Sequence, residues 1–175
     1  MRRQLMCLVG VTGMIVIGAL YVKVNATPQF GFTASTIAKG RFGDIDVANQ
    51  LVRRYGDATP QKDLWLSLQK TKGPSDLYVQ NNEWAVGGST GWHTHPGHSL
   101  IIVTAGTVTA YEGDSSTCTA TQYGVGTGFV DPGGNHVHLI RNEGSVVART
   151  IAVQLVAADA QRREDITPGP AGCPF

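Results

Sequence analysis

The sequence predicts an all-β protein built as a jelly-roll barrel, and three features support this fold class. Residues 64–69 alternate Leu with Trp, Ser and Gln, which is the period-two pattern of a strand with one face in a core. Turn formers separate such runs, among them Gly-Gly at 87–88, Pro-Gly at 96–97 and Asn-Glu-Gly at 142–144. The 22 Gly and 8 Pro have no period and fit many short strands better than long helices. An antiparallel barrel or double sheet follows.

The expected strands can be placed in order along the chain. The segment 39–63 is rich in charged residues and is expected to be a solvated loop or a short helix without a chemical role. Period-two or apolar runs predict strands at 32–37, 64–69, 76–80, 84–86, 91–95, 99–111, 128–130, 137–141 and 146–156.

The chain is expected to form one domain over residues 27–175. Of the 175 residues, 42% are hydrophobic and 15% are charged, which suits one well-cored domain and excludes disorder. The 14 Lys and Arg balance 13 Asp and Glu, so no net field would attract nucleic acid. Nucleic acid is therefore not an expected partner.

Residues 1–26 are expected to direct export. Arg2 and Arg3 precede an uncharged run over 4–22, and small residues lead up to Ala26, where a signal peptidase would cut. An uncleaved N-terminal membrane anchor is the alternative, since about 18 uncharged residues can just span a bilayer. Either way the folded part would lie outside the cytoplasm.

The cysteines agree with export. Cys7 lies in the expected signal, which leaves Cys118 in a polar loop and Cys173 close to the end of the chain. Two thiols in an oxidising compartment predict one disulfide, which would tie the tail to the body of the domain. Two unpaired thiols are the alternative.

The histidines predict a metal site. His93, His95 and His98 fall in one short window, and His136 and His138 fall in another. Residues two apart on a strand point to the same face, so each His-x-His pair could chelate an ion. Neutral imidazole is a common ligand for Zn, Fe, Ni and Cu. Surface histidines or hydrogen-bonded core histidines are the alternative.

These residues resemble a known family. The segment 91–95, with Ser99 and Gly106 after it, is similar to the first motif of the cupins, in which His-x-His is followed by a Glu and then a Gly. Ser99 stands where that family has its metal-binding Glu. The sequence therefore departs from the pattern at one of the four usual ligands.

A second stretch resembles the second cupin motif, which runs Gly, Pro, Gly, His, Asn. One extra residue separates the second Gly from the His, so His136 competes with His138 for the ligand position. His138 is favoured because it keeps the usual distance to the Asn. The matching residues are Gly126, Pro132, Gly134, His138 and Asn142.

The resemblance implies a cupin-type double-stranded β-helix, or jelly-roll barrel, with its motif core over residues 76–156. It implies one divalent transition metal, Fe, Mn, Zn or Ni, held by His93, His95 and His138. Without the Glu, water would complete the coordination and the charge of the ion would stay uncompensated, as in the three-histidine cupins that activate oxygen. His98 is expected at the rim, because strand alternation puts it on the opposite face from Ser99.

The sequence does not decide whether the protein is an enzyme. A metal-dependent oxygenase or isomerase acting on a small molecule is the first hypothesis, and a non-enzymatic cupin that binds a small ligand or a metal is the second. A metal-free structural domain is the third. Homodimers are common among cupins, so a second copy is a further expected partner. Fold alone cannot choose among these functions.

Overall fold

The computed structural model describes residues 28–55, 61–173 and 175, and the predicted signal or anchor lies outside them. The described residues form strands, turns and loops without a helix, so none of them forms a helix that could cross a bilayer. The strands are β1 (Phe30–Phe42), β2 (Asp46–Tyr55), β3 (Gln61–Lys70), β4 (Ser75–Ser89), β5 (His93–Thr94), β6 (Ser99–Ala105), β7 (Thr107–Glu112), β8 (Ala120–Gly124), β9 (Gly128–Asp131), β10 (His138–Arg141), β11 (Ala148–Ala157) and β12 (Glu164–Asp165).

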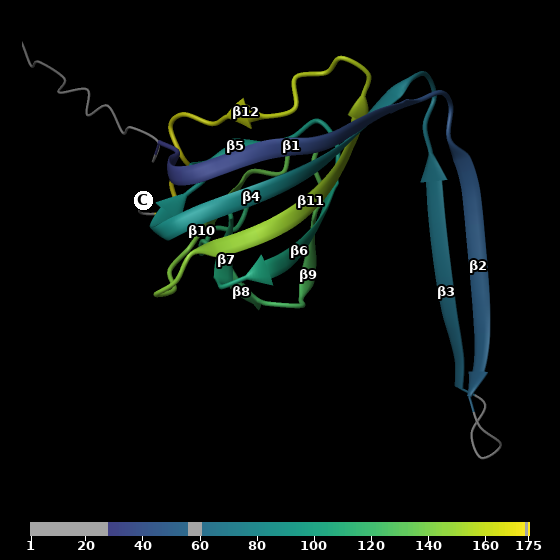
Figure 1. The fold of residues 1–175 in the computed structure, drawn as a ribbon, viewed down its shortest axis with the longest axis horizontal. Helices are drawn as coiled ribbons and strands as arrows, with labels where there is room; N and C mark the ends of the chain where they lie inside the picture. Colours follow the sequence, from purple (N-terminus) through teal and green to yellow (C-terminus); the bar gives the residue numbers. More distant parts are fainter. Residues whose placement is uncertain (1–27, 56–60, 174) are drawn as a thin grey trace, which may run out of the picture.

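Ten of these strands form one antiparallel sheet that curls into a barrel (Figure 1). Its main path runs β12, β5, β10, β4, β11, β6, β9, while β1 adds to β4 and β7 joins β10 to β8. Side chains alternate across the sheet: along β6, Ser99, Ile101 and Val103 are buried and the residues between them are exposed. The predicted all-β jelly-roll barrel is confirmed.

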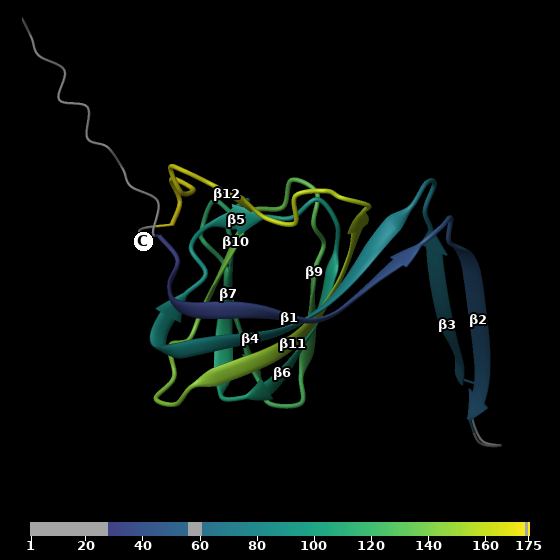
Figure 2. The same cartoon turned by 45° about the horizontal axis from the view of Figure 1, so that its top comes forward.

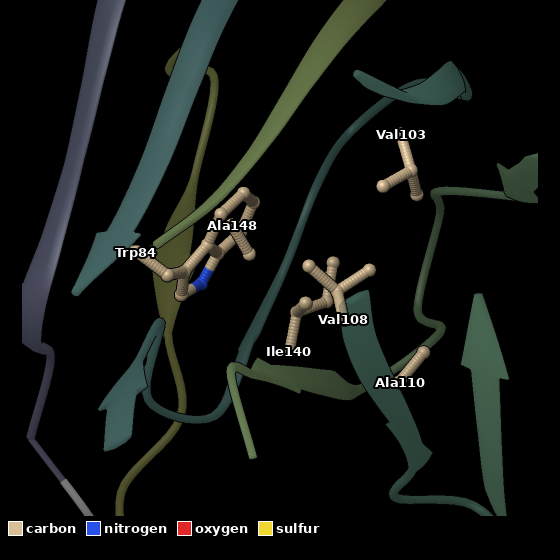
Figure 3. Packing of buried hydrophobic residues seen from close by; sticks show 6 residues of the cluster. All are labelled: Trp84, Val103, Val108, Ala110, Ile140 and Ala148. Carbon is tan, nitrogen blue, oxygen red and sulfur yellow. The ribbon is translucent and has the colours of Figure 1, made fainter. Parts of the chain in front are cut away.

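A cluster of buried hydrophobic side chains fills part of the interior of the barrel (Figure 3). It joins inward-facing residues of five strands, and Phe32, Tyr123 and Phe129 pack against it. Removing any large member would leave a cavity that rigid strands cannot close. The buried members are Trp84, Val103, Val108, Ala110, Ile140 and Ala148.

The expected loop or short helix over residues 39–63 is wrong. β1 continues to Phe42, and β2 and β3 form a two-stranded arm that projects from the barrel (Figure 2). Charges at two positions favour the pairing, because the antiparallel register sets Asp46 opposite Lys70 and Arg53 opposite Asp63, although Arg54 lies opposite Lys62. Lys70 lies opposite Asp46, and its Nζ is 2.8 Å from Oδ2.

The expected break at 87–88 is also absent, because β4 runs unbroken to Ser89. Gly88 instead allows close packing, because a Cβ there would overlap the carbonyl oxygen of Gly31 on β1. The expected strand 99–111 is divided instead at Gly106, whose φ of 64° lies in the left-handed region. β8 was not expected from the sequence.

A buried carboxylate fixes the junction between the barrel and the arm. The Asp76 side chain is fully buried and accepts hydrogen bonds from Arg41 Nε at 2.8 Å and Arg41 Nη2 at 2.9 Å. Lys39 Nζ lies 3.1 Å from the same carboxylate. The Arg41 hydrogen bonds, with smaller contributions from Lys39 and a backbone amide, hold the pKa of Asp76 well below its usual range.

We predict that Asp76→Asn lowers the thermal midpoint by several degrees at pH 7 and by less at pH 2.5. A carboxylate whose folded pKa is depressed stabilises the fold fully above its unfolded pKa of about 3.9, and this stabilisation decreases progressively as the pH falls from that value toward the folded pKa. Circular dichroism melts at both pH values measure this. Asp159→Asn is the control, because Asp159 also meets Arg41 but is exposed. An equal loss at both pH values would contradict the account.

Candidate metal centre

The barrel encloses a cavity of about 270 Å³. One part of its wall is apolar, with Phe32, Trp84, Ile101 and Ile140. The other part is polar and carries the imidazoles of His93, His95 and His138. Such a cavity suits a small ligand held by a few convergent polar groups.

Backbone pairing brings the three histidines together. His93 on β5 lies directly opposite His138 on β10, and His95 follows β5 on the same face. The ring centres are 4.2 Å apart for His93 and His138, 4.8 Å for His93 and His95, and 5.4 Å for His95 and His138. One nitrogen of each ring lies within 4.8 Å of one nitrogen of both others, so the three could hold one metal ion.

Two of the rings are oriented by backbone carbonyls. His93 Nδ1 lies 2.9 Å from the carbonyl oxygen of Gly91, and His95 Nδ1 lies 2.6 Å from that of Arg162. A carbonyl oxygen can only accept, so each Nδ1 carries the proton and each Nε2 keeps a free lone pair. This arrangement is typical of histidines that ligate metals.

The surroundings keep all three imidazoles neutral. Burial lowers the pKa of His93 well below its usual value, and the neighbouring His138 lowers it further. Burial also lowers the pKa of His95. It lowers the pKa of His138 to about 4, although Asp131 acts in the opposite direction. Neutral imidazole is the form that binds a metal ion.

Asp131, which the sequence analysis missed, also lies in this group. The residue is 4% exposed and ends β9. Its Oδ2 is 3.6 Å from His95 Nε2, and its Oδ1 is 3.7 Å from His138 Nδ1. A carboxylate that the sequence analysis did not anticipate therefore lies beside two of the three imidazoles. Strand alternation could have indicated this position, because it places Asp131 on the same face of β9 as the half-buried Phe129.

Neither of the two remaining histidines belongs to the three-histidine group, although His136 forms a second possible metal group with Asp131 and His138. His136 Nε2 lies 2.7 Å from Glu112 and His136 Nδ1 lies 3.1 Å from Asp114, so carboxylates occupy both of its nitrogens. This geometry favours His138 over His136 as the inward histidine. His98 lines a separate groove beside Leu100, on the opposite side of β6 from Ser99.

The C-terminal segment closes one side of the cavity. Glu164–Asp165 pairs with β5, and Arg163 Nη2 donates to the Thr90 carbonyl at 2.6 Å. The expected disulfide joins Cys118 to Cys173 and anchors this segment to the turn before β8. In the chain-entropy account a bridge across this loop contributes about 4 kcal/mol.

The antiparallel barrel and the two histidine motifs on its inner face define a cupin fold. No protein-family model and no curated protein matches the sequence. Among solved structures, a cupin superfamily protein from Desulfitobacterium hafniense is 15% identical, with 46% of this chain and 67% of that chain covered and a TM-score of 0.40.

Two enzymes show a similar partial likeness. An oxalate oxidase is 22% identical over 47% of this chain and 46% of its own, with a TM-score of 0.39. The DMSP lyase DddQ from Ruegeria pomeroyi is 16% identical over 53% of this chain and 44% of its own, with a TM-score of 0.45. The chain thus spans less than half the length of these two enzymes.

We predict that His93 and His138 remain neutral at pH 5.5 in the metal-free protein, and that His93 and His95 carry their proton on Nδ1 at pH 7. Ordinary imidazole, with a pKa of about 6.5, is mostly protonated at pH 5.5. Long-range proton–nitrogen NMR spectra report charge and tautomer for each ring. The urea-unfolded chain is the control. A charged His93 at pH 5.5, or Nε2–H tautomers, would contradict this geometry.

Proposed function

We propose that His93, His95 and His138 bind one divalent transition metal, Fe, Mn, Zn or Ni, and that the protein acts on a small molecule at that ion. The observation that carries the proposal is the pair of Nδ1–carbonyl contacts, which directs two Nε2 lone pairs into one space. A bound ion would supply Lewis-acid chemistry and open coordination positions. Oxygenation and isomerisation are the reaction classes we propose.

A cationic side chain in the cavity wall, Arg162, favours an anionic small molecule as the ligand. Arg162 is only partly exposed, its Nε donates to Gln154 Oε1 at 3.0 Å, and its guanidinium lies 4.3 Å from the Tyr78 ring centre. No carboxylate among the described residues forms an ion pair with it, whereas the neighbouring Arg163 pairs with Asp165 at 2.6 Å. A partly desolvated cation facing a cavity favours a carboxylate or similar anion.

A non-enzymatic binding protein is the second candidate. Apart from the three histidines, Asp131 and two arginines, the described cavity wall has only side chains that do not titrate, such as Gln80, Asn82 and Gln154. Asp131 is therefore the one carboxylate on the described wall, and no other general acid or base independent of the metal is found there. Turnover of small carboxylates by the metal-loaded protein would establish the enzyme, while saturable binding without turnover would establish the second candidate.

We also propose that two copies associate through the arm formed by β2 and β3. Trp65, Leu66 and Leu68 are 56%, 54% and 70% exposed on this arm. A hairpin of two strands is marginally stable alone, and exposed apolar groups of this size mark interaction sites. Light scattering at micromolar concentration should give the mass of two chains, and the mass of one chain would contradict the dimer.

We propose further that residues 1–26 export the domain, either as a cleaved signal or as an N-terminal anchor. The paired Arg2 and Arg3 before an apolar run support this, and so does the Cys118–Cys173 bridge, since disulfides persist in oxidising compartments.

Protein recovered from the export route should therefore contain no thiol that reacts with Ellman's reagent in denaturant, once residues 1–26 with Cys7 have been removed. After reduction it should contain two. The Cys118→Ser, Cys173→Ser double variant is the control. Two reactive thiols before reduction would contradict the bridge and remove one support for export.

The metal proposal predicts that His93→Ala combined with His95→Ala abolishes metal retention and leaves a folded barrel. Elemental analysis of the purified domain, prepared without chelators and after reconstitution, measures metal per chain. The unchanged protein should hold close to one equivalent, and His98→Ala, whose side chain lies outside the cavity, should hold the same. Stoichiometric metal in the double variant would refute the ligand assignment.

A further inference from the structure

The cavity contains a buried carboxylate, Asp131, that forms no ion pair with a Lys or Arg side chain among the described residues. Asp131 Oδ1 accepts a hydrogen bond from the Gly133 amide at 3.0 Å, while Oδ2 is buried and receives none from the described residues. The nearest basic atoms are nitrogens of His95 and His138. A buried carboxylate is costly unless it is paired or coordinates a metal.

The sheet register relates Asp131 to the missing Glu. Ser99 on β6, which stands at the position of the family's metal-binding Glu, lies directly opposite Asp131 on β9. Both residues are buried on the inner face, 3% and 4% exposed. Side chains at directly opposite positions have Cβ atoms about 5 Å apart. A carboxylate on β9 can therefore occupy the corner of the cavity that a Glu on β6 would otherwise fill.

The distances fit shared coordination. Two ligand atoms bound at about 2.1 Å to a tetrahedral ion are about 3.4 Å apart. Asp131 Oδ2 is 3.6 Å from His95 Nε2, which is the free nitrogen of that ring. Asp131 Oδ1 is 3.7 Å from His138 Nδ1, which is itself buried and unpartnered among the described residues. These two approaches use different oxygens of Asp131, and in the structure Asp131 forms a compact group with His136 and His138, which shares His138 with the three-histidine group. The carboxylate would therefore turn toward His93 and His95 on binding an ion.

We propose that Asp131 is the fourth protein ligand of this metal centre, a carboxylate supplied by β9 in place of the one absent from β6. This inference rests on the proposed metal binding by the three histidines. With Asp131 the protein contributes one negative charge, so the ion and its ligands together carry one positive charge instead of two. A carboxylate also favours Mn, Fe and Zn over softer ions.

The test compares the metal affinity of the unchanged protein with that of variants that remove the carboxylate of Asp131 or return one at position 99. Zn²⁺ and Mn²⁺ are titrated calorimetrically into metal-free protein at pH 7.5, with a competing chelator for Zn²⁺. Asp131→Asn keeps the size of the side chain and removes its charge, and should weaken binding by at least ~10–100-fold, the loss typical even of outer-shell partners. Ser99→Ala is the matched control, because it changes the opposite residue without touching the carboxylate, and should bind as the unchanged protein does.

A rescue variant distinguishes the loss of a metal ligand from a folding defect. Adding Ser99→Glu to Asp131→Asn returns a carboxylate to the β6 position, and should restore affinity to within ~10-fold of the unchanged protein. Thermal melts of the metal-free variants report folding separately. Unchanged affinity in Asp131→Asn, or a loss that Ser99→Glu does not restore, would overturn the role of Asp131. Failure of the unchanged protein to bind either ion would instead overturn the proposed function, and this inference with it.

Discussion

The pairing of His93 with His138 across β5 and β10 is the contact on which the geometry of the cavity depends. β5 has only two residues, so its position is set by β10 on one side and β12 on the other. The same pairing that closes this part of the barrel places two imidazoles side by side, with ring centres 4.2 Å apart. The carbonyls of Gly91 and Arg162 then fix the ring orientations of His93 and His95. A change in backbone register here would therefore alter the fold and the site together.

The charge of the cavity follows from this placement. Burial keeps the imidazoles neutral, and Asp131 adds the one carboxylate close to them. Neutral nitrogens and a single carboxylate form a donor set for a divalent cation rather than a network of ion pairs. His136 stacks beside His138 but contacts the carboxylates of Glu112 and Asp114 through its two nitrogens. Two histidines only two residues apart thus have different electrostatic environments, because only His136 has acidic partners at both nitrogens.

Much of this could be predicted from the sequence. Alternation and turn residues predict the barrel, and the spacing to Asn142 predicts that His138, not His136, faces inward. The role of Asp131 could not be read in the same way, because it depends on which residue of β6 lies opposite it, and register is a tertiary property. β2 and the start of β3 were missed because their charges resemble those of a loop. The strand at 64–69 was predicted, but its core face was wrong, because Leu66 and Leu68 are exposed on the arm.

The most direct measurement is anomalous X-ray diffraction from crystals of the metal-reconstituted protein, recorded at the absorption edge of the bound ion. The account predicts one strong peak among the imidazoles of His93, His95 and His138, with a carboxylate oxygen of Asp131 at about 2.1 Å. A peak beside His136, or no peak in the barrel of a fully reconstituted crystal, would contradict the central claim that this barrel is built around a metal ion.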